Sequence, residues 1–549
     1  MGDIAGLISK LPYLQDLGVD IIWLSPMYDS PQVDMGYDIS NYEDVYAPYG
    51  TLADMEDLIA ECHRLGMRLI LDLVINHVSN LHSWFQESRK SKDNPKRDWF
   101  IWRPARHVNG IRKPPNNWRC QVGGSAWEWD EATQEYYFHL FNPEQPDLNW
   151  ESDACRQAIY QSAVKFWLDK GVDGFRVDTV NLYSKNTAFP DVAVTNPDDE
   201  FQPAPEHFAN GPRMHEFLTE LDSQVLSKYD VMTVGELPHT KTNDKVLLYV
   251  HPRERQLNMV FQFDTVTLGH GRPDKFVLQS YNLVDFKKTL LRQQDVANRG
   301  GWSTSFLENH DQGRSISRFG TEDRQFMVRS GKLLTTMLCS LTGTLFVYQG
   351  QEIGMLNMPR EWPIDEYKDS ITLNFYNAVQ ARYASGGEQD SALAKAMVGI
   401  QEVARDHSRT PMQWDDSPTA GFTDGLPWTR VHDNYAEINV ARQRKDPDSL
   451  LCFWKQAFKF RKLHADVMVH GTFELNDLDN DKVVMWTKIF GEKKAVVILN
   501  FTSQPQRRPW PEGSTRDSFH LAFGNIKEQQ QEDELAAWEA RIYLSYIVQ

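Results

Sequence analysis

The chain has 549 residues, of which 41% are hydrophobic and 24% are charged, and its formal net charge is −18. This length allows one large domain with smaller satellites, and the composition is typical of a globular protein. The acidic balance argues against nucleic acid and other polyanionic partners, but it leaves a neutral substrate such as a sugar open.

Two further features of the composition concern the compartment. The five cysteines are scattered and show neither metal-ligand spacing nor a disulfide framework. No run of about 18 apolar residues predicts a membrane span. The N-terminus has no basic region followed by an apolar one, so no signal peptide is predicted and a cytoplasmic protein is expected.

Helix, glycine and apolar strand recur in that order at the start of the chain. Leucines at helical spacing predict a helix over residues 7–17, and residues 19–24 read as a buried strand. An amphipathic helix over 52–65 and a strand over 67–74 repeat the pattern. Helices that alternate with apolar strands predict a parallel sheet with the helices outside.

The alternation stops between residues 80 and 149, a part rich in Pro, Trp, Asn and charge, which we interpret as an inserted subdomain. Its basic stretch, residues 89–113, contains interleaved aromatic residues and leaves nucleic-acid binding conceivable. Acidic residues intervene, however, and the whole chain is acidic, so a solvated surface is the preferred interpretation.

The alternation then returns, with helices predicted over 155–170, 214–228 and 324–341, and strands over 174–177, 231–234, 257–261, 305–307 and 344–348. Seven core strands favour a (β/α)8 barrel with one strand unaccounted for. Residues 351–450 are polar and irregular with short helices, a helix follows near 451–463, and apolar strands over 483–486 and 495–499 predict a C-terminal β domain. The predicted organisation is an α/β barrel over 1–79 and 150–463, an inserted subdomain over 80–149, and a C-terminal β-sandwich over 464–549.

Three carboxylates follow three of the predicted strands, where barrels of this kind have their active sites: Asp178, Glu236 and Asp311. Taken alone, Asp178 and its neighbour Arg176 would more often form a structural ion pair, and Asp311 could be a helix N-cap. Arg176 is expected to lower the pKa of Asp178. Carboxylates that meet at one site are typical of glycoside hydrolysis.

Several motifs resemble the α-amylase family of glycoside hydrolases, family 13. Its four characteristic regions are similar to DLVINH at residues 72–77, GFRVD at 174–178, VGE at 234–236 and ENHD at 308–311. Its α-glucosidase and oligo-1,6-glucosidase subgroup is similar at QPDLN (145–149), QGQEIGM (349–355) and RTPMQW (409–414). The resemblance covers nearly the whole chain.

This resemblance implies a retaining mechanism and a role for each matched residue. Asp178 would be the nucleophile that forms a covalent β-glucosyl intermediate, Glu236 the general acid and then the base, and Asp311 the stabiliser of the oxocarbenium-like transition state. The implied substrate-binding residues are Arg176, which orients Asp178, His77 and His310 on sugar hydroxyls, Asp34 and Tyr37 around the non-reducing glucose, Arg409 paired with Asp34, and Thr179. A loop role for Asp34 and Tyr37 stays open, and a lone histidine at a strand end is usually structural.

Linkage preference is expected to depend on Thr179, directly after the predicted nucleophile. Threonine there is similar to fungal maltases, whereas α-1,6-acting relatives more often carry valine. This predicts cleavage of maltose, short malto-oligosaccharides and sucrose in preference to isomaltose, with isomaltase activity as the alternative. Sucrose isomerases share the fold, but no arginine-rich loop follows Asp311. A non-catalytic relative, like amino-acid transporter heavy chains, is disfavoured because all three carboxylates are present and no membrane anchor is visible.

The resemblance also predicts a missing element. Family members usually begin with a strand and a metal-binding, Asp-rich loop before the segment that matches residues 2–6, so the first barrel strand is expected to be missing from a truncated chain. The strands near residues 20 and 346 would then each lose a hydrogen-bonded neighbour. We therefore expect the stability of the fold to be lower, and the activity to be lower with it. No metal or other cofactor is expected. The expected partners are small neutral α-glucosides, without nucleic acid or membrane, and the expected oligomeric state is a monomer.

Overall fold

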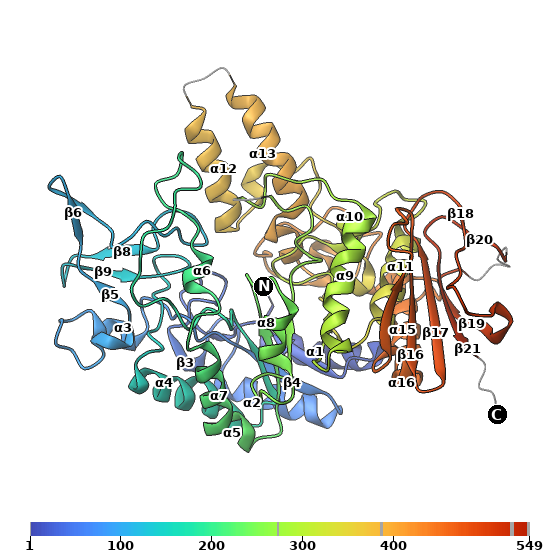
Figure 1. Cartoon of the computed structure of the whole chain (residues 1–549), viewed down its shortest axis with the longest axis horizontal. Helices are drawn as coiled ribbons and strands as arrows, with labels where there is room; N and C mark the ends of the chain where they lie inside the picture. The colour runs from blue at the N-terminus through green and yellow to red at the C-terminus, as the bar shows by residue number, and fades with distance from the viewer. Residues whose placement is uncertain (1, 272–273, 385–387, 527–531, 546–549) are drawn as a thin grey trace. The chain divides into compact units, whose positions relative to one another are not determined.

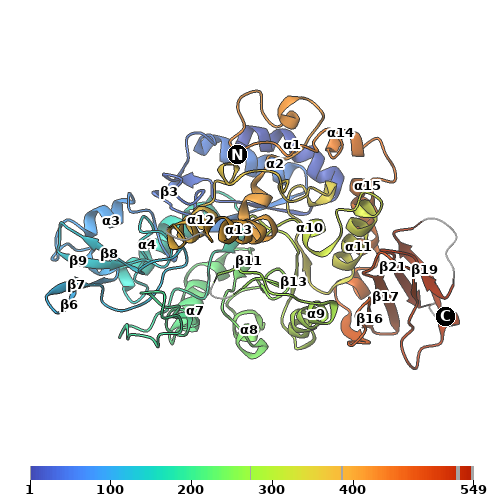
Figure 2. The ribbon, with the colours of Figure 1, turned by 90° about the horizontal axis from the view of Figure 1, so that it is seen from above.

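The structure is a computed structural model that describes residues 2–271, 274–384, 388–526 and 532–545 (Figures 1 and 2). The chain forms two compact units. The first comprises residues 2–15 and 19–261, and the second comprises residues 16–18 and 262–549. The three predicted domain boundaries, after residues 79, 149 and 463, stay predictions.

A five-stranded parallel sheet forms the centre of the first unit, in the order β1-β4-β10-β11-β12. Val177 pairs with Leu73 on one side and with Gly235 on the other, which fixes the register in the middle of the sheet. All four residues of β10 are buried, as expected when both faces of a parallel sheet are covered. The strands confirm five of the seven predicted: β1 (Ile21–Leu24), β4 (Arg68–Leu73), β10 (Gly174–Val177), β11 (Met232–Glu236) and β12 (Met259–Phe261).

The four helices that were predicted in this unit are present, and additional to them are α3 (Ser83–Ser88), α6 (Pro205–Phe208) and α8 (Asn243–Val250). α2 (Leu52–Arg64) begins with a capping box between Thr51 and Asp54, which satisfies backbone donors at its N-terminus. The helix predicted over 155–170 is present but is interrupted by a π-helical segment, Tyr160–Lys165, which hydrophobic periodicity does not indicate. The other helices are α1 (Ile4–Leu17), α4 (Asp153–Ile159), α5 (Phe166–Asp169) and α7 (Met214–Gln224).

The region predicted as an inserted subdomain forms short antiparallel sheets around an aromatic core. β5 (Trp102–Arg103), β9 (Glu135–Phe138) and β8 (Trp127–Asp130) make a three-stranded sheet, and β6 (Arg106–Val108) pairs with β7 (Ile111–Lys113). The core also takes in residues from the segment after β10, which the prediction did not assign to it: Leu182, Phe189, Ala204 and Phe208.

The basic stretch of this region is an ion-paired surface. Arg97 donates to Glu135 at 2.6 Å, Arg106 to Asp191 at 2.6 Å, and Lys113 to Glu200 at 2.7 Å. These cations are already neutralised, which supports the preferred interpretation of a solvated surface.

In the second unit, β13 (Thr304–Ser305) pairs in parallel with β14 (Thr344–Leu345), and these are the remaining two of the seven predicted strands. The associated helices are α9 (Leu283–Asn298), α10 (Ser315–Phe319), α11 (Met327–Ser340), α14 (Val440–Gln443), α15 (Leu450–Leu463) and α16 (Ala465–Met468). The expectation of only short helices over 351–450 is wrong, because α12 (Ser370–Arg382) and α13 (Gln389–Val403) have 13 and 15 residues.

The C-terminal part of this unit is an antiparallel sheet in the order β15-β16-β17-β21-β19, and Figures 1 and 2 both show β16, β17, β21 and β19 side by side. Its strands are β15 (Thr472–Asn476), β16 (Val483–Phe490), β17 (Lys493–Asn500), β19 (Phe519–Gly524) and β21 (Ala540–Ser545), and β18 (Gln506–Arg507) pairs separately with β20 (Glu534–Leu535). β16 and β17 contain the two strands that were predicted.

Two composition-based expectations can also be compared with the structure. All five cysteines are unpaired, which confirms that there is no disulfide framework. Among the described residues, no helix has the length and apolarity needed to cross a membrane.

Candidate active site

A single guanidinium organises the site of the first unit. Arg176 points from β10 and is 2% exposed. Its Nη1 lies 2.9 Å from Asp72 and 2.5 Å from Asp178, and its Nη2 lies 2.7 Å from Glu236. Three carboxylates from three adjacent strands therefore meet at one buried cation, as expected for side chains at the C-terminal ends of parallel strands.

The pKa of Asp178 lies above its ordinary value. Burial raises this pKa to about 6 against the lowering effect of Arg176, and the Asp72 charge acts in the same direction as burial. The expected lowering effect of Arg176 is present, but desolvation at a site that the sequence does not reveal outweighs it, so the net shift of the pKa is upward. At neutral pH the carboxylate still ionises, as a nucleophile requires.

Asp72 completes this site and was not among the predicted site residues. Its carboxylate is fully buried and accepts hydrogen bonds from Tyr37 Oη at 2.8 Å and from Trp23 Nε1 at 3.2 Å, in addition to Arg176. The Arg176 guanidinium also lies 5.1 Å from the Trp23 ring and 5.8 Å from the Tyr37 ring. The sequence signals for Asp72 are its place at the end of a predicted strand and its position as the first residue of the DLVINH motif.

Thr179 contacts both predicted catalytic carboxylates of this unit. Its backbone N–H donates to Glu236 Oε2 at 3.2 Å, and its hydroxyl lies 3.2 Å from Asp178 Oδ2. The residue has φ 38°, a left-handed conformation that is rare for a β-branched side chain. Such strain persists only where surrounding contacts impose it, and here it aims the N–H at Glu236.

His77 and Asp34 are brought together by the QPDLN segment. The Gln145 amide lies 3.2 Å from His77 Nε2 and donates to Asp34 Oδ2 at 3.3 Å. His77 Nε2 also lies 3.1 Å from the Tyr37 carbonyl, and burial lowers the pKa of His77, which keeps the imidazole neutral. The predicted residues Asp34, Tyr37 and His77 therefore lie in one cluster.

A lysine ammonium joins the QPDLN segment to the residues that follow β4. Lys185 Nζ lies 2.9 Å from Asp147 Oδ2, 3.1 Å from Asn76 Oδ1 and 2.7 Å from the Leu182 carbonyl. A lysine in a loop is expected to be solvated, so nothing in the sequence indicates that Lys185 forms a buried ion pair. Across the residues that the structure describes, no group of three or more His, Cys, Asp or Glu side chains is arranged to hold a metal ion.

The remaining predicted residues belong to the second unit. There the Asp311 carboxylate lies beside two guanidinium groups and an imidazole. Arg409 Nη2 lies 2.8 Å from this carboxylate, Arg405 Nη1 lies 3.3 Å away, and His310 Nε2 lies 3.6 Å away. Burial opposes ionisation, but His310, Arg405 and Arg409 hold the pKa of Asp311 well below its usual range.

The structure rules out the N-cap alternative for Asp311 and adds Arg405 to its neighbours. Asp311 is not an N-cap, because α10 begins after Arg314. Arg405, which the sequence did not single out, also pairs with the buried Asp369 at 2.6 Å, and the resulting network lowers the pKa of Asp369 to about 2 against the effect of burial. The predicted pairing of Arg409 with Asp34 joins two separate units and stays a prediction.

The chain is similar to known proteins over nearly its whole length. A family model described as the α-amylase catalytic domain matches residues 1–471. An α-glucosidase of Candida albicans is 50% identical over 99% of this chain and 95% of its own. Oligo-1,6-glucosidase IMA2 of Saccharomyces cerevisiae is 46% identical over 99% and 94%.

The chain is also similar to solved structures over nearly its whole length. The crystal structure of the trehalose-6-phosphate hydrolase of Bacillus licheniformis is 37% identical in sequence and has a TM-score of 0.90, with 100% of this chain and 96% of that chain covered. These similarities confirm the predicted fold class, a (β/α)8 barrel with an inserted subdomain and a C-terminal sheet domain.

Proposed function

This chain belongs to the α-amylase family of glycoside hydrolases, and we propose that it is a retaining, exo-acting α-glucosidase. The observation that carries the proposal is the guanidinium of Arg176, which contacts both Asp178 and Glu236. Retaining glycosidases need two carboxyl groups only about 5 Å apart, and one shared cation keeps the two as near neighbours.

In the proposed mechanism the ionised Asp178 attacks the anomeric carbon of the terminal glucose. Glu236 gives its proton to the leaving glycosidic oxygen, and a glucosyl ester of Asp178 forms with inversion. Glu236, now ionised, takes a proton from water, whose oxygen displaces Asp178 and releases α-glucose with overall retention. The low pKa of Asp311 keeps this side chain negative, as a stabiliser of a cationic transition state must be.

Substrate recognition is assigned to the clusters in each unit. We propose that Asp34, Tyr37 and His77 bind hydroxyl groups of the terminal glucose, with Gln145 fixing the orientation of Asp34 and His77. His310 and Arg409 would supply further donors from the second unit. The substrates are small neutral α-glucosides, in line with the glucosidase names of the relatives.

Two candidate activities differ in the glycosidic linkage that is cleaved. We propose α-1,4 cleavage of maltose and short malto-oligosaccharides, together with sucrose, because Thr179 places a hydroxyl at the nucleophile. The alternative is α-1,6 cleavage, which is favoured by the 46% identity with a protein named oligo-1,6-glucosidase. An α-1,6 preference would make isomaltose the fastest substrate.

A substrate panel tests this proposal. We expect the purified protein to release glucose from maltose and sucrose faster than from isomaltose, and the D178N variant to lose the activity on all three. Fastest hydrolysis of isomaltose would overturn the linkage, and equal activity of D178N would overturn the mechanism. No activity on any sugar would favour the non-catalytic alternative.

Three further expectations belong to this proposal: a monomer, a cytoplasmic location and activity without a metal cofactor. Their support is the sequence, with its acidic composition and unpaired cysteines. Gel filtration tests the monomer directly. An assay after dialysis against a chelator tests the activity without a metal, and loss of activity after this dialysis would contradict that expectation.

A further inference from the structure

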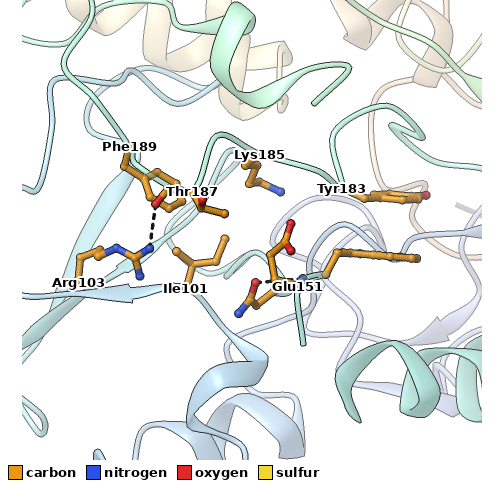
Figure 3. Close-up of a pocket in the computed structure, with 9 residues that line it drawn as sticks. Ile101, Arg103, Glu151, Tyr183, Lys185, Thr187 and Phe189 are labelled. Carbon is orange, nitrogen blue, oxygen red and sulfur yellow. Dashed lines mark hydrogen bonds between the residues drawn. The ribbon is translucent and has the colours of Figure 1, made fainter. Parts of the chain in front are cut away.

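A hollow of about 170 Å³ lies in the first unit, next to the residues that support the catalytic strands (Figure 3). Its walls combine apolar and aromatic side chains with charged ones. Figure 3 shows Arg103 and Thr187 at one end and Glu151 with Tyr183 at the other. None of its lining residues has a part in the proposed reaction.

The inner wall is rigid and is anchored to the active site. The rings of Trp150 and Tyr183 stack at 4.4 Å with an interplanar angle of 6°. Tyr183 Oη donates to the Asp178 carbonyl at 3.0 Å, and Trp150 Nε1 donates to the Ile75 carbonyl at 2.9 Å. The stacked pair is held in place at both ends, so this wall of the hollow is preformed, as is typical of small-molecule sites.

The opposite end presents a cation with spare donors. The Arg103 guanidinium donates to the carbonyls of Trp102 at 2.8 Å and Thr187 at 3.2 Å and lies 4.9 Å from the Phe189 ring. Among the residues that the structure describes, Arg103 takes part in no ion pair. A guanidinium has five N–H donors, and the two carbonyls take one each, so further donors can serve a ligand.

The lining also limits the charge of the ligand. Glu151 accepts from Arg213 and Lys185 pairs with Asp147, so both of these charges are balanced within the protein. A free anion would still lie close to Glu151 and a free cation close to Arg103, so a neutral molecule fits best. Hydroxyl groups both donate and accept, and can therefore satisfy a guanidinium and a carboxylate at once.

The size of the hollow gives the last constraint. An apolar cavity of about 150 Å³ in another protein takes up benzene, and a pyranose has twice as many non-hydrogen atoms, so a sugar ring would enter this hollow with some of its hydroxyl groups outside. We propose that this hollow is a second binding site, separate from the catalytic carboxylates, for a neutral monosaccharide in its pyranose form. The choice of glucose as the ligand to test rests on the proposed function, since glucose is the product of that reaction.

The experiment first blocks the catalytic centre. A cyclitol epoxide, which esterifies a glycosidase nucleophile, is allowed to react with the full chain, and mass spectrometry locates the label on Asp178. Equilibrium dialysis with radiolabelled glucose then counts the remaining sites. We expect one glucose bound per labelled chain, and no binding by the labelled chain would overturn the proposal.

Two variants assign that binding to the hollow. R103L removes the donors, and loss of hydrogen bonds to a charged group should weaken binding at least about tenfold. T187W fills the space from an exposed position and should abolish binding without lowering the melting temperature. R106L is the matched control, because Arg106 is an exposed arginine paired with Asp191, and it should bind glucose as the parent chain does. Unchanged binding in R103L and T187W would contradict the site.

Failure of this proposal differs from failure of the proposed function. If the epoxide leaves Asp178 unmodified, the assigned nucleophile is wrong, and the comparison of T187W with R106L on unlabelled protein still tests the hollow. If Asp178 is labelled and glucose does not bind, the proposed reaction stands and the second site is refuted.

Discussion

Arg176 shows how one residue can set the chemistry of a site. It holds Asp72, Asp178 and Glu236 within 2.5–2.9 Å of its guanidinium, and all of these groups except Glu236 are buried. Its charge offsets part of the desolvation cost of three carboxylates. What remains is a nucleophile whose pKa lies near neutrality rather than far below it.

The pH dependence of activity follows from this residue. Burial raises the pKa of Asp178 to about 6, and attack needs the ionised form, so kcat/KM for maltose should fall as the pH drops through about 6. Asp72 contributes to the raised pKa, so D72N should move this limb to lower pH. A pH–rate profile measures both, with the exposed Asp169 changed to Asn as control. A wild-type limb near pH 4 would contradict the prediction.

Thr179 is the residue at which linkage preference should be tested. In T179V the hydroxyl that lies 3.2 Å from Asp178 is replaced by a methyl group, while the backbone N–H to Glu236 is kept. We expect the ratio of kcat/KM for isomaltose to that for maltose to rise about tenfold or more, in the range of about 1–3 kcal/mol. Rates on p-nitrophenyl α-glucoside provide the reference. An unchanged ratio would place the linkage preference elsewhere.

At the scale of elements, Lys185 joins three segments of the first unit. Its ammonium binds Asn76 after β4, Asp147 of the QPDLN segment and the Leu182 carbonyl after β10. The inserted region is therefore fastened to the strand ends by one internal cation, and His77 lies beside this junction.

Removal of that cation should be costly. K185M leaves the buried carboxylate of Asp147 uncompensated, and we expect the free energy of unfolding to drop by about 3–5 kcal/mol. K170M removes the partner of the exposed Glu56 and should cost less than about 1 kcal/mol. Urea unfolding followed by tryptophan fluorescence compares the two variants. Equal midpoints would show that the junction is not held by Lys185.

The elements also show where sequence patterns are informative. Apolar runs locate every strand of the parallel sheet, and β4 and β10 are buried along almost their whole length because strands that are covered on both faces show no polar alternation. α12 escaped prediction because only Thr372 is fully buried among its 13 residues, and the apolar side chains that pack against the core, such as Ile371 and Phe375, are only partly buried. The π-helical segment Tyr160–Lys165 likewise leaves no mark in the local composition.

At the scale of the whole molecule, the net charge of −18 bears on the kind of substrate. Long-range fields accelerate or repel charged ligands only, and salt screens them. We expect kcat/KM for maltose to change less than about twofold between low and high salt. A sugar phosphate, used as a charged control, should be repelled most at low salt. A steep salt dependence with maltose would argue against a neutral substrate.

The fold of the whole chain also determines whether a sequence motif is accessible. Asn500 belongs to an Asn-Phe-Thr triplet that fits a glycosylation sequon. In the fold its side chain is fully buried and donates to the carbonyls of Gln504 and Ala536, both at 2.8 Å. The folded protein therefore cannot present this residue to a glycosylating enzyme.

The sequence by itself determined the family and the strands of the parallel sheet, and it singled out Asp178, Glu236 and Asp311 as the predicted catalytic residues, because motifs and apolar runs are local properties. Only the tertiary structure decided the pKa of Asp178, the roles of Asp72 and Lys185, and the hollow beside Tyr183. The reason is physical. Desolvation and ion pairing depend on which distant side chains share a buried space, and β4, β10 and β11 bring such side chains together from positions up to about 160 residues apart.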